Sequence, residues 1–210
     1  MACRLAFLVA LAFLAGCAGF GGGYYGPGAG FFDTVVVDAG HGGHDRGARA
    51  VSGSPEKVLV LDTARRLAVE LRKRGFRVIE TRGDDRFISL SRRAEISNAT
   101  SRSVFVSVHY NWARRSGARG IEVFYHTEKS RRLAANILKE ALSVYPTPNR
   151  GIKTARFYVL RNNKRPAVLL ELGFLSNYSD NRYVQQAGYR QKLAERVAEG
   201  IAAERAGRNP

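Results

Sequence analysis

The sequence predicts a single α/β domain in which helices cover both faces of a sheet. Short runs of β-branched and apolar residues, typical of buried strands, alternate with longer segments whose apolar residues recur at helical spacing. The hydrophobic content of 45% is enough for a full core, and a length of 210 residues fits one domain and a tail. The chain shows no internal repeat.

The expected elements follow from local signals along the chain. Apolar runs predict strands at 35–38, 76–81, 103–109, 120–126 and 167–172, with a further short strand at 157–160. Helical spacing predicts helices at 54–74, 89–98, 128–145 and 180–205. In the first helix Ser54 is a suitable N-cap, Pro55 fits the first turn, and Gly75 ends the helix.

The first 32 residues are expected to be an export signal and a tether. Arg4 precedes an apolar run that is too short to span a bilayer comfortably and is followed by small residues, as in a secretory signal peptide. The stretch Leu14–Cys17 resembles the bacterial lipobox, which predicts a signal peptide over 1–16 and a lipid on Cys17. Residues 17–32 are then a glycine-rich tether, and 33–206 form the folded domain. The alternative, an N-terminal core helix, would lack a polar face.

These features predict an exported, lipid-anchored protein. Ala18, rather than Asp, follows Cys17, which is compatible with the outer membrane and a domain facing the periplasm. Cys3 would leave with the signal peptide and Cys17 would carry the lipid, so the folded domain would contain no cysteine at all. This excludes disulfides and cysteine-based metal sites from the domain.

The net charge is +16, from 34 basic and 18 acidic residues. Such an excess favours a polyanionic partner, which could be nucleic acid, an anionic membrane surface or an acidic polymer. The basic residues are scattered along the chain and no nucleic-acid motif is present, so nucleic-acid binding is not expected.

Three reactive side chains are expected at one end of the sheet. His41 follows the first strand on a turn where Gly40, Gly42 and Gly43 permit a sharp bend. His109 ends the strand at 103–109. Glu171 lies inside the apolar strand at 167–172, where an unpaired charge would be costly. Ligands of α/β proteins gather beyond the carboxyl ends of the strands.

A second carboxylate, Glu56, begins the helix that follows the glycine-rich loop and is expected near the same place. Two histidines and a carboxylate from separate elements can form a three-ligand zinc site with an open fourth position. The remaining carboxylate can then act as general base and acid, which implies hydrolysis of an amide or ester.

Taken singly, each of these residues also has an ordinary structural explanation. Glu56 could complement the helix dipole, His109 could be a core histidine, and Glu171 could pair with an arginine. His44 and His126 are competing ligands, in a loop and on a strand expected near an edge.

Four motifs in this order resemble the zinc-dependent N-acetylmuramoyl-L-alanine amidases of the amidase-3 type: Val35–Gly47, Ser54–Lys57, Ser107–Asn111 and Ala167–Asn177. The similarity runs from about residue 33 to residue 204. The resemblance implies a twisted, mostly parallel sheet of about six strands. It also implies that zinc (Zn2+) is bound by His41, Glu56 and His109, and that Glu171 is the catalytic acid/base. The implied reaction cleaves the amide between the lactyl group of N-acetylmuramic acid and L-alanine in peptidoglycan.

Other positions extend or depart from the family pattern. Thr81-Arg82 and the pair Arg93 and Asn98 match it and are expected to support the site or contact substrate. Ala39 stands where the family often has proline, and His44 where it often has lysine; neither is an expected ligand.

The segment after the second histidine predicts how the site is regulated. Some members of this family that act in cell division carry a helical insertion there that blocks the zinc. After His109 and Tyr110, only the nine residues Asn111–Arg119 precede the next strand, so we expect an open site that requires no activator protein. A monomer is expected, held to the membrane through Cys17. Two other functions stay open: an inactive peptidoglycan-binding lipoprotein, and a zinc peptidase acting on another amide.

Overall fold

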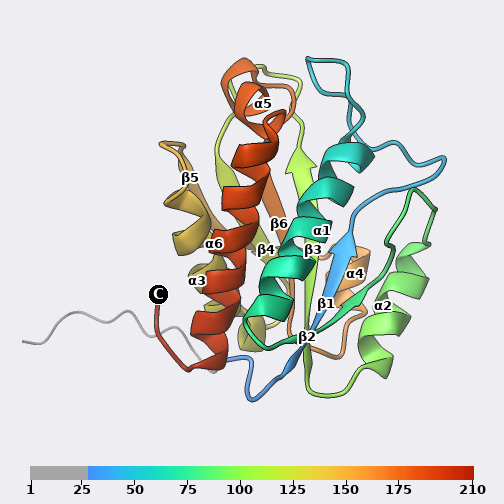
Figure 1. Ribbon diagram of the computed structural model, residues 1–210, viewed down its shortest axis with the longest axis vertical. Coiled ribbons are helices and arrows are strands. Elements are labelled where there is room, and N and C mark those ends of the chain that lie inside the picture. Colours follow the sequence, from blue (N-terminus) through green and yellow to red (C-terminus); the bar gives the residue numbers. More distant parts are fainter. Residues whose placement is uncertain (1–27) are drawn as a thin grey trace, which may run out of the picture.

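The protein is described by a computed structural model over residues 28–210, so the predictions for the signal peptide and Cys17 lie outside the described residues. A six-stranded sheet with the order β2-β1-β3-β6-β4-β5 forms its centre (Figure 1). The strands are β1 (Thr34–Ala39), β2 (Arg77–Glu80), β3 (Ser103–Asn111), β4 (Ile121–Tyr125), β5 (Asn149–Thr154) and β6 (Ala167–Phe174). Neighbouring strands are parallel except β4 and β6, which are antiparallel. The predicted α/β fold with a mostly parallel sheet is therefore confirmed.

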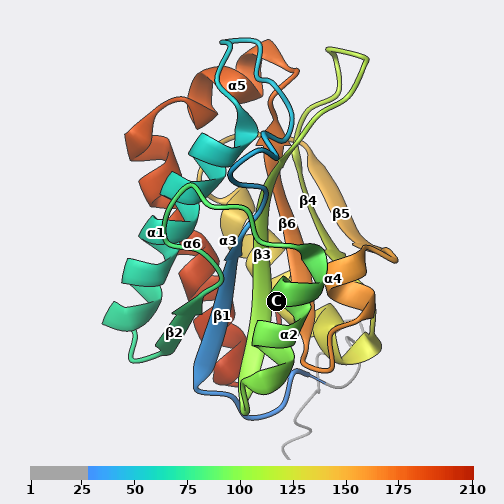
Figure 2. The same cartoon turned by 90° about the vertical axis from the view of Figure 1, so that its right-hand side faces the viewer.

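Helices cover both faces of the sheet, as predicted (Figures 1 and 2). One face packs against α1 (Glu56–Lys73), α3 (Arg131–Leu142) and α6 (Ala187–Arg205). The other face is covered over part of its length by α2 (Leu90–Ala99) and the single turn α4 (Tyr158–Arg161). The remaining short helices are η1 (Glu128–Ser130), before α3, and α5 (Tyr178–Val184), after β6.

Successive side chains of β3 alternate between the two faces of the sheet. Val104, Val106 and Val108 belong to the large core beneath α1, α3 and α6. Phe105 lies on the opposite face, in the smaller core beneath α2 and α4. Because side chains two residues apart share a face, His109 lies on this second face, beyond the part that the helices cover.

Three elements differ from the sequence prediction. Residues 157–160 were expected to be a strand, but they enter the helical turn α4, since a short apolar run does not distinguish the two. The edge strand β5 was not predicted. The closing helix is divided at Gln185–Gln186 into α5 and α6.

The start of α1 also differs from the prediction. The helix begins at Glu56 with Pro55 at the cap position, and no side chain caps it. The Ser54 hydroxyl donates to Gln185 instead. Main-chain carbonyls of the preceding loop take over the capping role, because Ala48 O accepts from Glu56 N and Arg46 O accepts from Lys57 N.

The folded unit includes residues just before Asp33. Phe32 is buried, and its ring stacks on Phe76 with the centroids 5.8 Å apart. The main-chain N–H of Ala29 donates to Glu204 on α6. Within residues 28–210, no helix has the length and apolar character needed to cross a membrane.

Candidate active site

The turn after β1 brings His41 close to His109. His41 has φ of +60°, a left-handed conformation that non-glycine residues rarely adopt. Gly40 must be glycine, because a Cβ there would lie 2.2 Å from Cε1 of His109. The two imidazole rings are edge-to-face, with centroids 4.9 Å apart.

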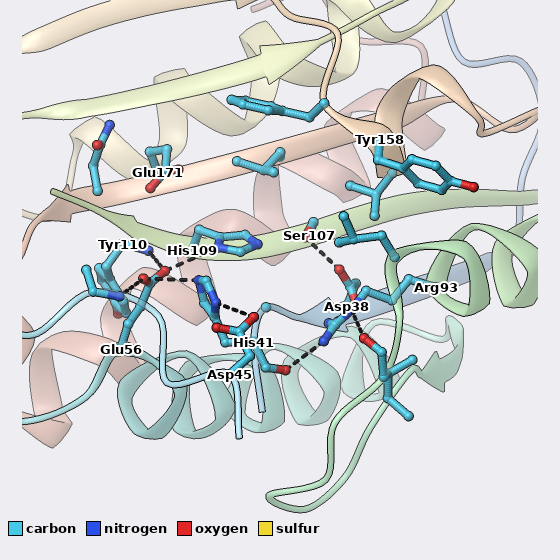
Figure 3. A pocket seen from close by; sticks show the side chains of 18 of the residues that line it. Asp38, His41, Asp45, Glu56, Arg93, Ser107, His109, Tyr110, Tyr158 and Glu171 are labelled. Atoms are coloured by element: carbon cyan, nitrogen blue, oxygen red, sulfur yellow. Dashed lines mark hydrogen bonds and ion pairs between the residues drawn. The ribbon is translucent and has the colours of Figure 1, made fainter. Parts of the chain in front are cut away.

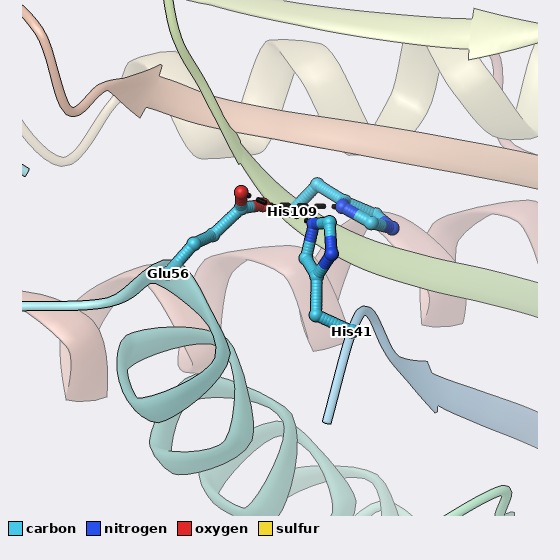
Figure 4. Close-up of side chains that lie close together, drawn as sticks. All are labelled: His41, Glu56 and His109. Atoms are coloured by element: carbon cyan, nitrogen blue, oxygen red, sulfur yellow. Dashed lines mark hydrogen bonds and ion pairs between the residues drawn. The ribbon is translucent and has the colours of Figure 1, made fainter. Parts of the chain in front are cut away.

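The carboxylate of Glu56 points from the start of α1 towards both histidines (Figure 4). Its Oε2 is 3.1 Å from Nε2 of His41, and its Oε1 is 3.2 Å from Nδ1 of His109. Main-chain N–H groups of Ala48 and Tyr110 donate to the same two oxygens, at 2.9 and 3.1 Å. Each of the three side chains offers a ligand atom, and these atoms lie within 4.8 Å of one another. The structure therefore brings together all three predicted metal ligands.

Glu56 and His41 shift each other's pKa in opposite directions. Burial raises the pKa of Glu56, but the hydrogen bonds to His109 and His41 outweigh it and hold that pKa well below its usual range. Burial lowers the pKa of His41, but the carboxylates of Glu56 and Asp45 outweigh it, so the pKa is raised. Glu56 is therefore an ionised carboxylate, as a metal ligand must be.

Asp45 also lies in the site, although its sequence position did not predict this. Its Oδ2 lies 2.9 Å from Nδ1 of His41, and its Oδ1 accepts from Gly47 N–H at 3.0 Å. Histidine ligands commonly direct their second ring nitrogen to a carboxylate, which fixes the tautomer and the ring orientation. Its position four residues after His41 was an available signal, but the conformation of the glycine turn decides whether the two side chains meet.

Glu171 lies in the same row as His109. It is the register partner of His109 on the parallel strand β3 and of Glu122 on the antiparallel strand β4. The three side chains thus occupy adjacent positions across three strands on one face of the sheet. Oε2 of Glu171 is buried and has no hydrogen-bond partner within residues 28–210. Burial, followed by the charges of Glu56 and Glu122, raises the pKa of Glu171 well above its usual value.

A cavity of about 560 Å³ extends from this row along the sheet face towards α2 and α4. Figure 3 shows Glu171 at one end and Tyr158 at the other, with His41, His109 and Glu56 beside Glu171. The walls are mainly large apolar side chains: Phe87, Ile88, Leu90, Trp112, Phe157 and Tyr158. Five of them are 39–55% exposed, so they are available to contact a ligand.

The two competing histidines lie outside the cluster. The ring of His44 packs on Phe87, with centroids 4.1 Å apart. His126 follows β4, which runs antiparallel to β6. The last residue of β4, Tyr125, pairs with Val168 near the start of β6, so His126 lies further along the strands, away from Glu171. Neither residue belongs to the metal-ligating group.

Comparison with known proteins agrees with this geometry. Residues 35–203 match the amidase-3 family, described as N-acetylmuramoyl-L-alanine amidase. The N-acetylmuramoyl-L-alanine amidase LytC of Bacillus subtilis (strain 168) is 36% identical over 172 residues, which cover 80% of this chain but only 34% of LytC.

Solved structures show the same fold. An N-acetylmuramoyl-L-alanine amidase from Clostridium difficile 630 has a TM-score of 0.79 and 36% identity, covering 82% of this chain and 96% of that one. The CwlD amidase from Clostridioides difficile was solved in complex with the GerS lipoprotein. It has a TM-score of 0.79 and 31% identity, and the match covers 83% of this chain and 99% of that one. The chain therefore belongs to the N-acetylmuramoyl-L-alanine amidase family of enzymes.

Proposed function

We propose that the protein is a zinc-dependent amidase that cleaves the bond between the lactyl group of N-acetylmuramic acid and L-alanine in peptidoglycan. The observation that carries this proposal is the convergence of His41, Glu56 and His109 within 4.8 Å, beside Glu171 with its unpartnered oxygen. The family of the chain supports the substrate, and the side chains support the chemistry.

The three converging side chains fit zinc. Two imidazoles and one carboxylate are a donor set of catalytic zinc sites, which keep a fourth position for water or substrate. Asp45 holds the ring of His41 as a carboxylate partner does in such sites. When bound, the ion would lower the pKa of a water molecule and polarise the scissile carbonyl.

Glu171 would move the proton. It accepts a proton from the attacking water as the new C–O bond forms. It then returns that proton to the nitrogen of L-alanine as the C–N bond breaks, so the products are a lactyl carboxylic acid and a free amine. Burial raises the pKa of the Glu171 carboxyl, which makes it a stronger base for the first step than an exposed glutamate would be.

The cavity walls suit a glycopeptide. Sugar rings have apolar faces that pack on aromatic side chains, and Trp112, Phe157 and Tyr158 present such surfaces beside the row of His109 and Glu171. We infer that these residues contact substrate around the scissile bond.

Digestion of purified peptidoglycan sacculi tests the activity. Mass spectrometry should detect released stem peptides that begin with L-alanine. Incubation with a chelator should abolish their release, and added zinc should restore it. Peptides that begin at another residue would instead indicate a zinc peptidase, and binding without any release would indicate an inactive wall-binding protein.

We also propose that the site acts without an activator. In the described part of the chain, β3 and β4 are joined by the residues between Asn111 and Ile121, which contain no helix that could cover the site. CwlD was solved with a lipoprotein partner, so the point requires a direct test. Purified protein alone should digest sacculi, and a strict requirement for an added protein would contradict the proposal.

The location of the protein is a further proposal. The lipobox-like stretch before Cys17 supports a lipid anchor, and Ala18 supports the outer membrane with the domain in the periplasm. Metabolic labelling with a palmitate analogue should mark the wild-type protein but not Cys17→Ala. Equal labelling of both proteins would exclude Cys17 as the anchor.

A further inference from the structure

Two buried arginines lie against the turn that presents His41. Arg82 follows β2 and Arg93 lies on α2, and each residue is only 2% exposed. Figure 3 shows Arg93 on the side of His41 that faces away from Glu56. Neither arginine belongs to the cluster of metal-ligating atoms.

Together the two guanidinium groups donate to three consecutive carbonyl oxygens, at the end of β1 and just beyond it. Arg82 donates to Ala39 O at 2.9 Å and to Gly40 O at 2.6 Å. Arg93 donates to Ala39 O at 2.6 Å and to His41 O at 2.6 Å. Since β1 ends at Ala39, the carbonyls of Gly40 and His41 lie beyond the strand, and the arginines supply hydrogen bonds that buried carbonyls need.

The bonding of Arg82 is unusual for a buried charge. Within residues 28–210 it forms no ion pair, and its other bonds go to the main-chain carbonyls of Asp84 and Lys57. Burial, followed by repulsion from Arg93, lowers its pKa. A charge in this position is costly, so the fold retains it for the geometry that it imposes on the turn.

Arg93 is anchored at a second point. Its Nη1 lies 2.7 Å from Oδ1 of Asp38, whose oxygens also accept from Thr81 at 2.6 Å and from Ser107 at 2.7 Å. The guanidinium is therefore fixed to strands β1 and β3 and to the segment after β2. A rigid donor of this kind can hold the backbone of His41 in its left-handed conformation, which is otherwise unfavourable.

We propose that Arg82 and Arg93 are positioning residues that fix the backbone of His41, so that its ring faces Glu56 and His109 before a metal ion binds. This inference rests on the proposed zinc site. The planar fork of arginine reaches two carbonyls at a fixed separation, whereas a lysine ammonium would keep the charge without that geometry. Lysine substitutions therefore separate positioning from charge.

Zinc affinity of the full-length protein is the test, measured with zinc alone in competition with a chromogenic chelator. Arg93→Lys and Arg82→Lys should each weaken zinc binding by about 10- to 100-fold, the range for residues that orient metal ligands. Circular dichroism establishes that each variant is folded. If Arg93→Lys does not fold, Arg82→Lys decides the question, because it leaves the pair of Arg93 with Asp38 intact.

Arg190→Lys is the matched control. Arg190 is also largely buried, and it donates to Asp62 and to Val184 O on the opposite face of the sheet. It should lose stability but keep the wild-type zinc affinity. Unchanged affinity in folded Arg93→Lys and Arg82→Lys, or an equal loss in Arg190→Lys, would overturn the positioning role alone. Wild-type protein that binds no zinc would overturn the metal site and the positioning role together.

Discussion

Glu171 and Glu122 are register partners on the antiparallel strands β6 and β4, yet their carboxylates have opposite surroundings. Glu122 is buried and bonded to Asn111, Arg150 and Lys153. Glu171 has a buried oxygen without a partner in the described part of the chain. Glu122 is therefore fixed by several polar contacts, whereas Glu171 keeps a buried oxygen that the surrounding side chains do not satisfy.

Replacing Glu171 should remove catalysis while leaving the zinc ligands in place. Glu171→Gln preserves the shape of the side chain but cannot accept a proton, so we expect the release of L-alanine peptides to fall by about 10²- to 10⁴-fold. Metal content, measured by mass spectrometry of the purified protein, should stay at the wild-type level. Glu95→Gln, on the exposed face of α2, is the control. Activity of Glu171→Gln close to that of wild type would contradict the assigned role.

The same substitution should change how stability depends on pH. In metal-free protein the pKa of Glu171 is raised when the chain is folded, through burial and then through the charges of Glu56 and Glu122. Its protonated form is thus favoured by folding. The stability it contributes is present below the unfolded pKa of about 4.3 and is lost as pH rises through the folded pKa.

Glu171→Gln should therefore be more stable than wild type at pH 8 in the presence of a chelator, and the difference should vanish near pH 4. Denaturant unfolding at a series of pH values measures this. A difference that grows as pH falls would show that the carboxylate is stabilised in the folded state.

Gly40→Ala should disrupt the proposed zinc site with little effect on the rest of the fold. A Cβ at Gly40 would lie 2.2 Å from Cε1 and 2.4 Å from Nε2 of His109, so the ring must move. We expect activity to fall by about 100-fold or more, since displacements of about 1 Å have effects of this size. Gly83→Ala is the matched control, because a Cβ there meets no atom within 4 Å. Peptide release and zinc affinity are measured for both, and equal values in the two variants would refute the steric argument.

Trp112→Ala should weaken substrate binding more than it slows the reaction. The indole lines the cavity and is 53% exposed. Loss of an aromatic contact should raise KM for a soluble muropeptide by roughly 3- to 10-fold, with kcat close to the wild-type value. Tyr178→Ala, which removes an exposed ring on α5 away from the cavity, should leave both constants unchanged. A selective fall in kcat would instead place Trp112 near the reacting atoms.

The site was more predictable from the sequence than some elements of the fold. His41, His109 and Glu171 each interrupt or end an apolar strand, and parallel strands bring such positions to one region. The structure confirms that His41, Glu56 and His109 converge and places Glu171 as the ladder partner of His109.

The structural features that the sequence did not predict each have a local physical explanation. β5, Asn149–Thr154, has neither an apolar run nor a regular alternation, because it is an edge strand with little burial. The division between α5 and α6 falls at two glutamines, and the nearest glycine, Gly188, lies inside the first turn of α6 and does not mark the break. Asp45 and the paired state of Glu122 depend on how loops and neighbouring strands meet, which the spacing of residues does not specify.

The place of β6 in the sheet also determines when the active site can exist. This strand is the last to be synthesised, yet it inserts between β3 and β4 near the middle of the sheet. The three metal ligands all lie within the first 111 residues, on or beside β1, α1 and β3, whereas Glu171 comes with the final strand. A chain that stops before residue 167 would contain the three proposed metal ligands but lack Glu171, the proposed acid–base group. The proposed hydrolysis therefore depends on a strand that joins the sheet through long-range pairing with both β3 and β4.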